Sequence, residues 1–273
     1  MKHKVVSMVN YEYFKFGELF IKTRKNINAE FIIYNTQLSD RQNKILNDND
    51  IKSIKISRKE FENKMMYLKF KFIKEQIQDC DLVTFVDFDT YFINDWGNII
   101  FNRDFDIGIT VRNDMVNKNC VRAFANGGVI FTKNNFSLNY DKKDWIIDYA
   151  LKIMENGNDD NLFEYDIIFK TLENNKRPKH KRHFRSNLRC WCDQVFLSAL
   201  VMKYFNNINE KVNINNEYKC YNFLKNKIML LDADVFNSLD DIYHYNSNKN
   251  VFIRHLKDSG RSEFGEKTNL LGA

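Results

Sequence analysis

The sequence predicts an α/β fold with a Rossmann-like, mostly parallel central sheet flanked by helices. In the first third of the chain, short apolar segments alternate with longer amphipathic segments. This alternation is typical of parallel strands joined by crossover helices. No Gly/Ser-rich linker and no internal repeat interrupts the chain. We therefore expect one domain over residues 1–273, with residues 1–95 and 96–273 as its two halves.

The first half contains four expected strands, at residues 4–9, 30–34, 51–56 and 81–87, and three expected helices, at 12–26, 39–49 and 59–79. Ser39 is a suitable cap for the second helix. In the third helix Met66, Phe70, Ile73 and Ile77 recur at spacings of four, three and four, which predicts one buried face. The fourth strand is almost wholly apolar, as expected for a strand buried on both faces.

The second half is less regular. Strands are expected at residues 105–111, 127–132, 227–233 and 251–255, and helices at 142–156 and 192–205. The order of these elements still favours a single α/β domain over two separate ones.

The composition indicates a globular protein with a large core. Hydrophobic residues make up 44% of the chain, with 24 Phe and 13 Tyr, which excludes a disordered protein. No apolar run approaches the roughly 18 residues of a membrane span, and the N-terminal segment lacks the apolar centre of a signal peptide. We therefore expect an intracellular, cytoplasmic protein, and peripheral association with a membrane stays open. The cysteines have no framework or CxxC spacing and are expected to be reduced: Cys80, Cys120, Cys190, Cys192 and Cys220.

The net charge of +6 is concentrated in one segment. Residues 174–189 contain seven Lys or Arg and no acidic residue, which leaves 35 basic against 36 acidic residues elsewhere. Such a segment can be a solvated loop, or it can attract an anionic partner.

Two aspartates, Asp87 and Asp89, follow the fourth strand. Alternate residues of a strand point the same way, so both carboxylates are expected on one side of the strand end, where ligands bind in parallel α/β sheets. Two like charges this close are unfavourable unless a cation lies between them. A divalent cation such as Mn²⁺ or Mg²⁺ suits paired oxygen ligands. The alternative is that each aspartate is an ordinary turn residue.

Two enzyme classes use an Asp-x-Asp motif after a strand. Haloacid-dehalogenase-type phosphohydrolases place it after the first strand, with a Thr or Val two residues beyond the second Asp, whereas Thr90 follows Asp89 directly. Nucleotide-sugar glycosyltransferases of the GT-A type place the motif after about four strands, as in this chain. The position therefore favours a glycosyltransferase.

Several blocks then resemble the glycogenin-like, family 8 glycosyltransferases, in the family's order and over most of the chain. The block "VNYEYFKFG" is similar to the family's first nucleotide-binding turn, which implies that Asn10 and Tyr13 lie near the base and that Tyr13 stacks on it. Tyr13 could equally be an ordinary helix-face aromatic residue. Lys69 takes the place of the lysine that approaches the donor, although most helix lysines are simply solvated.

Two further blocks carry residues that the resemblance places beside the sugar. "FANGGVIF" is similar to the family's Asn-small-Gly-Val block and implies roles in donor binding for Asn126, Gly127 and Gly128. A β-bulge would also explain the adjacent glycines. "CDQVFLSALV" is similar to the Asp-Gln block that opens a helix, which implies catalytic roles for Asp193 and Gln194, and an Asp at this position is also a good N-cap.

The last block, "VFIRHLKDSGR", resembles the late strand whose His is the third metal ligand. This implies that His255 joins Asp87 and Asp89, and that Lys257, Gly260 and Arg261 hold the diphosphate. The family has its Gly three residues after the His, whereas Gly260 lies five after it, and "SEF" replaces the family's Lys-Pro-Trp. Which basic residue meets the phosphate therefore stays open.

The resemblance implies a Mn²⁺- or Mg²⁺-dependent transfer from a nucleotide-sugar donor, a UDP-sugar, with retention of configuration. The basic segment, residues 174–189, predicts an anionic acceptor, whether a glycan, a lipid or a nucleic acid. Two alternatives stay open: a nucleic-acid-binding protein that uses this segment, and an Asp-x-Asp phosphohydrolase.

Overall fold

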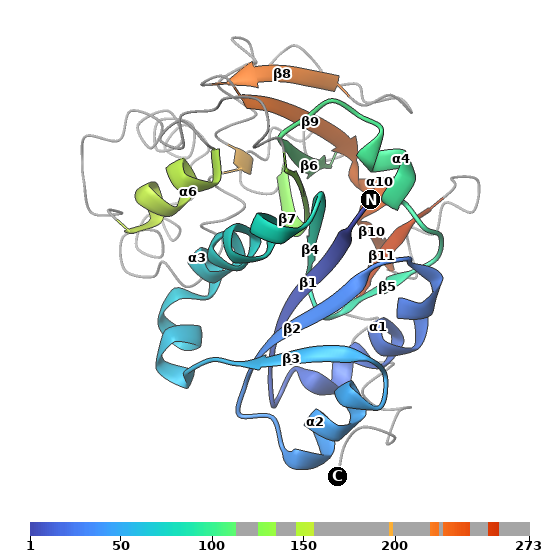
Figure 1. Ribbon diagram of the computed structural model, residues 1–273, viewed down its shortest axis with the longest axis vertical. Coiled ribbons are helices and arrows are strands. Elements are labelled where there is room, and N and C mark those ends of the chain that lie inside the picture. Colours follow the sequence, from blue (N-terminus) through green and yellow to red (C-terminus); the bar gives the residue numbers. More distant parts are fainter. Residues whose placement is uncertain are drawn as a thin grey trace, which may run out of the picture.

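The computed structural model of the chain describes residues 1–112, 125–134, 146–155, 197–198, 219–223, 226–240 and 251–256. The strands of this part form a sheet in the order β3-β2-β1-β4-β7-β6-β9-β8 and a small sheet in the order β10-β11-β5 (Figure 1). Their bounds are β1 His3–Asn10, β2 Glu30–Thr36, β3 Ile51–Lys55, β4 Leu82–Val86, β5 Thr90–Phe92, β6 Ile107–Val111, β7 Ala125–Lys133, β8 Lys219–Phe223, β9 Asn226–Asp232, β10 Ser238–Asp240 and β11 Ile253–Leu256. The α-helices are α1 Glu18–Thr23, α2 Asp40–Asn47, α3 Arg58–Gln76, α4 Gly97–Phe101, α6 Ile146–Glu155 and α10 Ala233–Phe236.

The large sheet is mostly parallel. β3, β2, β1 and β4 run in the same direction, and β6 is parallel to β9. β7 is antiparallel to both of its neighbours, β4 and β6, and β8 is antiparallel to β9. The predicted α/β class and the mostly parallel sheet are therefore confirmed. The inserted β7 starts at the edge where β4 and β6 end, so residues of all three strands meet there.

Helices cover both faces of the large sheet, and the small sheet lies on one of these faces (Figure 1). On one face, α3 and α6 pack through apolar side chains against one set of strand residues, among them Val6 and Phe85. On the other face, α1, α2, α4 and the small sheet pack against the alternate set, among them Val5 and Val86. Because neighbouring strand residues point to opposite faces, each inner strand is buried on both sides.

The helix expected at residues 12–26 is interrupted. It consists of a 3₁₀ turn at Phe14–Gly17, the short helix α1 and a second 3₁₀ turn at Arg24–Asn26. The first break falls at Gly17, where a Cβ atom would lie 2.0 Å from the ring of Phe88. The chain thus packs backbone against an aromatic ring at this point, which a regular helix with side chains could not do.

The other predicted helices of the first half are confirmed. Ser39 caps α2 by accepting a hydrogen bond from the backbone N–H of Gln42, whose side chain accepts in return from the N–H of Ser39. In α3 the predicted buried face is present at Phe70, Ile73 and Ile77, which are fully buried. The side chain of Met66, the fourth member of that face, lies outside the described residues.

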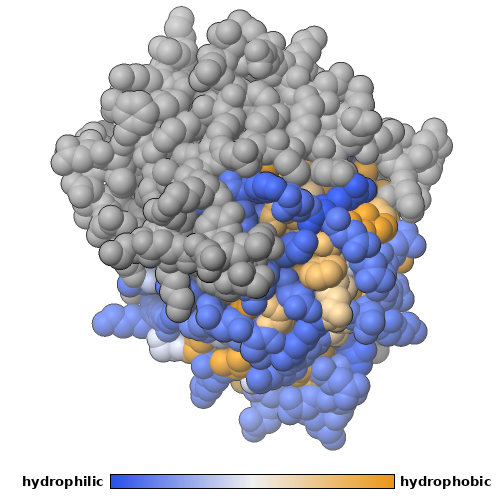
Figure 2. Space-filling view, turned by 45° about the horizontal axis from the view of Figure 1, so that its top comes forward, coloured by the Kyte–Doolittle hydropathy of each residue, from blue (hydrophilic) through white to orange (hydrophobic). Residues whose placement is uncertain are grey.

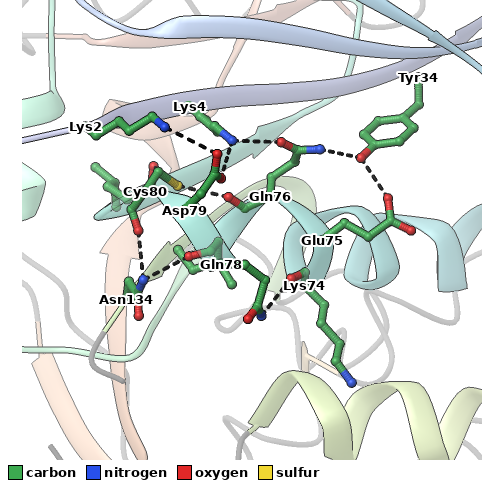
Figure 3. Close-up of polar contacts among 12 residues, drawn as sticks. Lys2, Lys4, Tyr34, Lys74, Glu75, Gln76, Gln78, Asp79, Cys80 and Asn134 are labelled. Carbon is green, nitrogen blue, oxygen red and sulfur yellow. Dashed lines mark hydrogen bonds and ion pairs between the residues drawn. The ribbon is translucent and has the colours of Figure 1, made fainter. Parts of the chain in front are cut away.

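A polar network anchors the C-terminal end of α3 to the sheet (Figure 3). The hydroxyl of Tyr34 donates to Glu75 Oε2 at 2.8 Å and accepts from Gln76 Nε2 at 2.6 Å. Gln76 Oε1 accepts from Lys4 Nζ at 3.0 Å, and Lys4 also forms an ion pair with Asp79. These contacts join α3 to β1 and β2, and they hold in place the helix that carries Lys69.

The described surface is mainly hydrophilic on the face shown in Figure 2, with small hydrophobic areas between the polar side chains. In the part of the chain that the structure covers, none of the helices is both long enough and apolar enough to cross a membrane. Cys80 is buried and is not in a disulfide, as expected. Cys120, Cys190 and Cys192, and the side chain of Cys220, lie outside the described residues.

Candidate metal and nucleotide site

Asp87 and Asp89 lie in the turn that joins β4 to β5. The N–H of Asp87 donates to the carbonyl of Gly128 at 2.9 Å, and the N–H and hydroxyl of Thr90 both donate to the carbonyl of Asp87, at 3.2 and 2.7 Å. Between the two aspartates, the side chain of Phe88 is buried in the core, where it packs against Phe14 and Phe20. Backbone hydrogen bonds and the packing of the Phe88 ring in the core together fix the conformation of the turn.

Strand pairing brings His255 to the same turn. β11 runs antiparallel to β5, with His255 opposite Thr90, and the N–H of Leu256 donates to the carbonyl of Asp89 at 2.8 Å. His255 Nε2 lies 3.0 Å from Asp89 Oδ1 and 3.7 Å from Asp87 Oδ2. One ligand atom from each of the three residues lies within 4.8 Å of the others. Two carboxylates and one imidazole thus converge on one point.

The three residues fit a divalent cation. The side chains of His255 and Asp89 are 1% and 4% exposed, whereas that of Asp87 is 31% exposed, so the group opens to solvent on the side of Asp87. Within the described part of the chain, the buried His255 Nε2 forms no hydrogen bond, although it lies 3.0 Å from Asp89 Oδ1, while Nδ1 lies 3.0 Å from Asn237 Oδ1. One imidazole nitrogen and two carboxylate oxygens together form a set of ligand atoms suited to Mn²⁺ or Mg²⁺.

Lys69 reaches the same point from α3. Its side chain is 5% exposed, and its ammonium group donates to Asp87 Oδ1 and to the carbonyl of Gly127, each at 3.0 Å. Lys69 is therefore not an ordinary solvated helix lysine. Its ammonium group offsets the charge of the Asp87 carboxylate. A divalent cation held by Asp87, Asp89 and His255 would stabilise the second carboxylate, that of Asp89, which is buried.

Directly after Asn126, residues Gly127, Gly128 and Val129 form a bulge in β7 relative to β6. In the pairing of β6 with β7, Ile109 lies opposite Ile130 but Thr110 lies opposite Asn126, so the residues between are left out of the ladder. Asn126 Oδ1 accepts from the N–H of Gly128 at 3.0 Å. The bulge that the adjacent glycines allowed for is therefore present, and it lies against the metal-ligand group.

Gly128 lies where a side chain would collide with that group. A Cβ atom there would lie 2.7 and 2.8 Å from ring atoms of His255 and 3.1 Å from Asp87 Oδ2. The glycine is thus required so that β7 can approach the histidine and the carboxylate closely. Asn126, beside it, is buried, and its Nδ2 has no partner among the described residues, which leaves a donor at the edge of the site.

The predicted base-binding turn follows β1 at the same edge of the sheet. Asn10 Oδ1 accepts from the N–H of Tyr13 at 2.9 Å, which closes the turn. Tyr13 is 46% exposed, and its ring packs edge-on against that of Phe16, with the ring centroids 5.5 Å apart. Gly17 then packs on Phe88, so this turn and the turn of the aspartates are in contact through one aromatic ring.

Other predicted site residues lie outside the described residues: Asp193, Gln194, Lys257, Gly260, Arg261 and the basic segment, residues 174–189. Among those described, the structure brings together Lys69, Asp87, Asp89, Asn126 to Gly128 and His255. Sequence reasoning missed Asn237, the partner of His255 Nδ1. No motif surrounds it, and only the fold could have revealed it.

No family model and no curated protein matches the chain in sequence. In structure the chain is similar to galactosyltransferase LgtC in complex with donor and acceptor sugar analogues, with a TM-score of 0.51, 13% identity, and 96% of this chain and 94% of that chain covered. It is also similar to an active-site mutant of LgtC in which glutamine is replaced by glutamate, with a TM-score of 0.50, 11% identity and the same coverage. The predicted GT-A type of fold is therefore confirmed.

Proposed function

We propose that this protein is a metal-dependent glycosyltransferase that moves a sugar from a UDP-sugar to an acceptor with retention, as the glycogenin-like, family 8 enzymes do. The observation that carries the proposal is the buried His255 Nε2, which faces the carboxylates of Asp89 and Asp87 at the strand-end edge of a GT-A fold. Ligands bind at this edge in open α/β sheets.

In this proposal Asp87, Asp89 and His255 hold Mn²⁺ or Mg²⁺. When bound, the ion supplies Lewis-acid stabilisation of the charge that develops on the leaving diphosphate. Lys69 orients the carboxylate of Asp87 through its hydrogen bond to Oδ1. Because this lysine is held by two acceptors, it is preorganised before the donor arrives.

The remaining roles concern the donor. Tyr13, exposed on a turn closed by Asn10, stacks on the base. Asn126 offers its buried amide N–H groups to the sugar or the diphosphate. Lys257 and Arg261, with Gly260 between them, add positive charge at the diphosphate. Asp193 and Gln194 lie beside the sugar.

For the acceptor we propose an anionic molecule that the basic segment, residues 174–189, attracts. The segment directly precedes the Asp-Gln block in the sequence, so its C-terminal end comes near the proposed sugar site. Neutralising Lys179, Lys181, Arg182 and Arg185 together is expected to raise the acceptor KM and to leave donor hydrolysis unchanged. A parallel fall in both rates would contradict this assignment.

The function is tested by incubating the protein with a panel of nucleotide sugars and measuring release of the nucleoside diphosphate. We expect release that requires Mn²⁺ or Mg²⁺, stops with EDTA and is abolished by Asp89→Asn at an unchanged melting temperature. Asp104→Asn, which changes a carboxylate that is 74% exposed and pairs with Lys227, is the matched control. Full activity in EDTA, or in Asp89→Asn, would overturn the proposal.

Two further measurements separate the alternatives. Hydrolysis of phosphomonoesters without release of sugar would indicate a phosphohydrolase. Retention of DNA or RNA with a steep salt dependence, in the absence of any turnover of nucleotide sugars, would indicate a nucleic-acid-binding protein.

A further inference from the structure

His255 is held on both sides of its ring by different kinds of group. Nε2 faces the two carboxylates, and Nδ1 lies 3.0 Å from Asn237 Oδ1. Both His255 and Asn237 are 1% exposed, so water does not compete for these atoms. The partner of Nδ1 therefore decides which ring nitrogen carries a proton.

A chain of hydrogen bonds sets the orientation of the Asn237 amide. The backbone carbonyl oxygen of Asn126 can only accept a hydrogen bond. The hydroxyl of Thr110 therefore donates to it, at 3.0 Å. With its hydrogen engaged, Thr110 Oγ1 accepts, and Asn237 Nδ2 lies 3.3 Å from it as the donor. The amide therefore presents its NH₂ group to Thr110 and its oxygen to His255. An oxygen at that position accepts a hydrogen bond, so Nδ1 of the imidazole carries the hydrogen.

We infer that Asn237 is a positioning residue that keeps the proton of His255 on Nδ1 and so directs the lone pair of Nε2 at the metal site. This inference rests on the proposed function, since it assigns a role to Asn237 in binding the metal there. Metal-binding histidines generally donate their other ring N–H to an oxygen, which fixes the tautomer and the orientation of the ring.

The fold places Asn237 for this role. Its N–H donates to the carbonyl of Ala233 at 2.8 Å, which ends α10, and the next residue begins β10. β10 is parallel to β11, with Leu239 opposite His255, so Asn237, which directly precedes β10, is held beside the strand that carries His255. At the other end of the chain of hydrogen bonds, Asn126 and Thr110 lie opposite each other in the pairing of β7 with β6, next to the bulge. The site is thus supported from both sheets.

The test measures Mn²⁺ binding by the full-length protein, in the presence of UDP, from the paramagnetic resonance of free Mn²⁺. Asn237→Leu removes the acceptor and is expected to weaken Mn²⁺ binding by roughly 10- to 100-fold. Asn237→Asp keeps an oxygen for the Nδ1 hydrogen and is expected to stay within about threefold of the wild type, as carboxylate–histidine–metal arrangements do. Asn134→Leu is the matched control, because it removes a side-chain amide that donates to the backbone carbonyls of Ile77 and Cys80 at the opposite end of the β4–β7 pair.

A second measurement does not depend on the Asn237 variants. A long-range ¹H–¹⁵N spectrum of the metal-free wild-type protein reports which ring nitrogens of His255 carry hydrogen, with the signals assigned by comparison with His255→Gln. A hydrogen on Nδ1 and none on Nε2 supports the inference even if Asn237→Leu fails to fold, and a hydrogen on Nε2 overturns it.

The outcomes separate the inference from the proposed function. If the wild type binds no Mn²⁺ with or without UDP, the proposed function is overturned and the inference with it. If the wild type binds Mn²⁺ and Asn237→Leu binds it as tightly as Asn134→Leu does, only the inference is overturned. Equal losses in Asn237→Leu and Asn237→Asp would also overturn it, because the acceptor oxygen would then not be what matters.

Discussion

Lys69 and Asp87 form an ion pair at the end of β4, with Nζ 3.0 Å from Oδ1. The ammonium group also donates to the carbonyl of Gly127, so it joins the metal-ligand turn to the bulge of β7. One buried lysine of α3 therefore sets the position of two of the segments that build the candidate site.

Lys69→Met is expected to lower kcat/KM for donor hydrolysis by roughly 10- to 100-fold, because Asp87 loses the partner that orients its carboxylate. The measurement is Mn²⁺-dependent release of UDP. Lys71→Met is the control, since Lys71 lies on the same helix but pairs with Glu60 at a half-exposed position. Equal rates for the two variants would show that the ion pair has no part in the reaction.

Gly128→Ala is expected to disrupt the candidate metal site without unfolding the protein. The added Cβ would lie 2.7 Å from the ring of His255 and would push it from the carboxylates. We expect Mn²⁺ binding to weaken by roughly 10-fold or more, as when a ligand is displaced from its position. Gly97→Ala is the control, because its nearest contacts are at 3.1 Å or more and involve side-chain ends remote from the site. Unchanged Mn²⁺ affinity in Gly128→Ala would contradict the close approach.

Gly17→Ala is expected to cost about 1–3 kcal/mol of the free energy of unfolding, as overpacking a core does. The reason is the overlap with Phe88, whose ring lies 2.0 Å from the position of the added Cβ. Phe88→Leu replaces that ring with a smaller side chain, which relieves part of the overlap. The double variant should therefore lose less stability than the sum of the two single changes, in a cycle measured by urea unfolding. Additive losses would indicate that the two residues do not interact.

Stability is expected to fall between pH 6.5 and about pH 4 because of His3. Burial lowers the pKa of His3 from 6.5 to about 4, and the nearby carboxylate of Asp95 only partly opposes this. In that window the unfolded chain binds a proton that the native protein does not, so stability is full above pH 6.5 and is lost as the pH falls. At about 1.4 kcal/mol for each pKa unit, the full loss is on the order of 3 kcal/mol.

The measurement for His3 is urea unfolding at pH 7 and at pH 4.5, for the wild type and for His3→Gln. Glutamine can keep a hydrogen bond to Thr84 Oγ1, which His3 Nε2 contacts at 2.9 Å, but it does not titrate. The variant should therefore lose less stability on acidification than the wild type. Parallel losses in the two proteins would assign the pH dependence to other groups.

Asp193→Asn and Gln194→Ala are expected to lower kcat far more than they lower the melting temperature. The basis is the similarity of "CDQ" to the family block that opens a helix beside the sugar. If Asp193 serves only as a helix cap, its loss would cost about 1 kcal/mol of stability and leave turnover unchanged. Kinetics and thermal unfolding of the same preparations decide between the two.

The strand and helix order of the first half could be predicted because it depends on local patterns. The apolar strand that ends at Asp87 and the cap at Ser39 can be recognised from residues a few positions apart. The same holds for the adjacent glycines of the β7 bulge. The helix at residues 12–26 was predicted as continuous because nothing local reveals that Gly17 must accommodate the ring of Phe88.

In the candidate metal site, too, some features follow from local sequence and others from tertiary structure. By itself the sequence determined that two carboxylates follow the fourth strand, because neighbours in a chain stay neighbours in the fold. The resemblance of the last block implied that His255 joins them, but only the tertiary structure shows how, since the antiparallel register of β5 with β11 sets His255 opposite Thr90. The tertiary structure also decided that Lys69 is buried and that Asn237 faces the imidazole. Such contacts depend on long-range strand pairing and packing, whose partners no local pattern specifies.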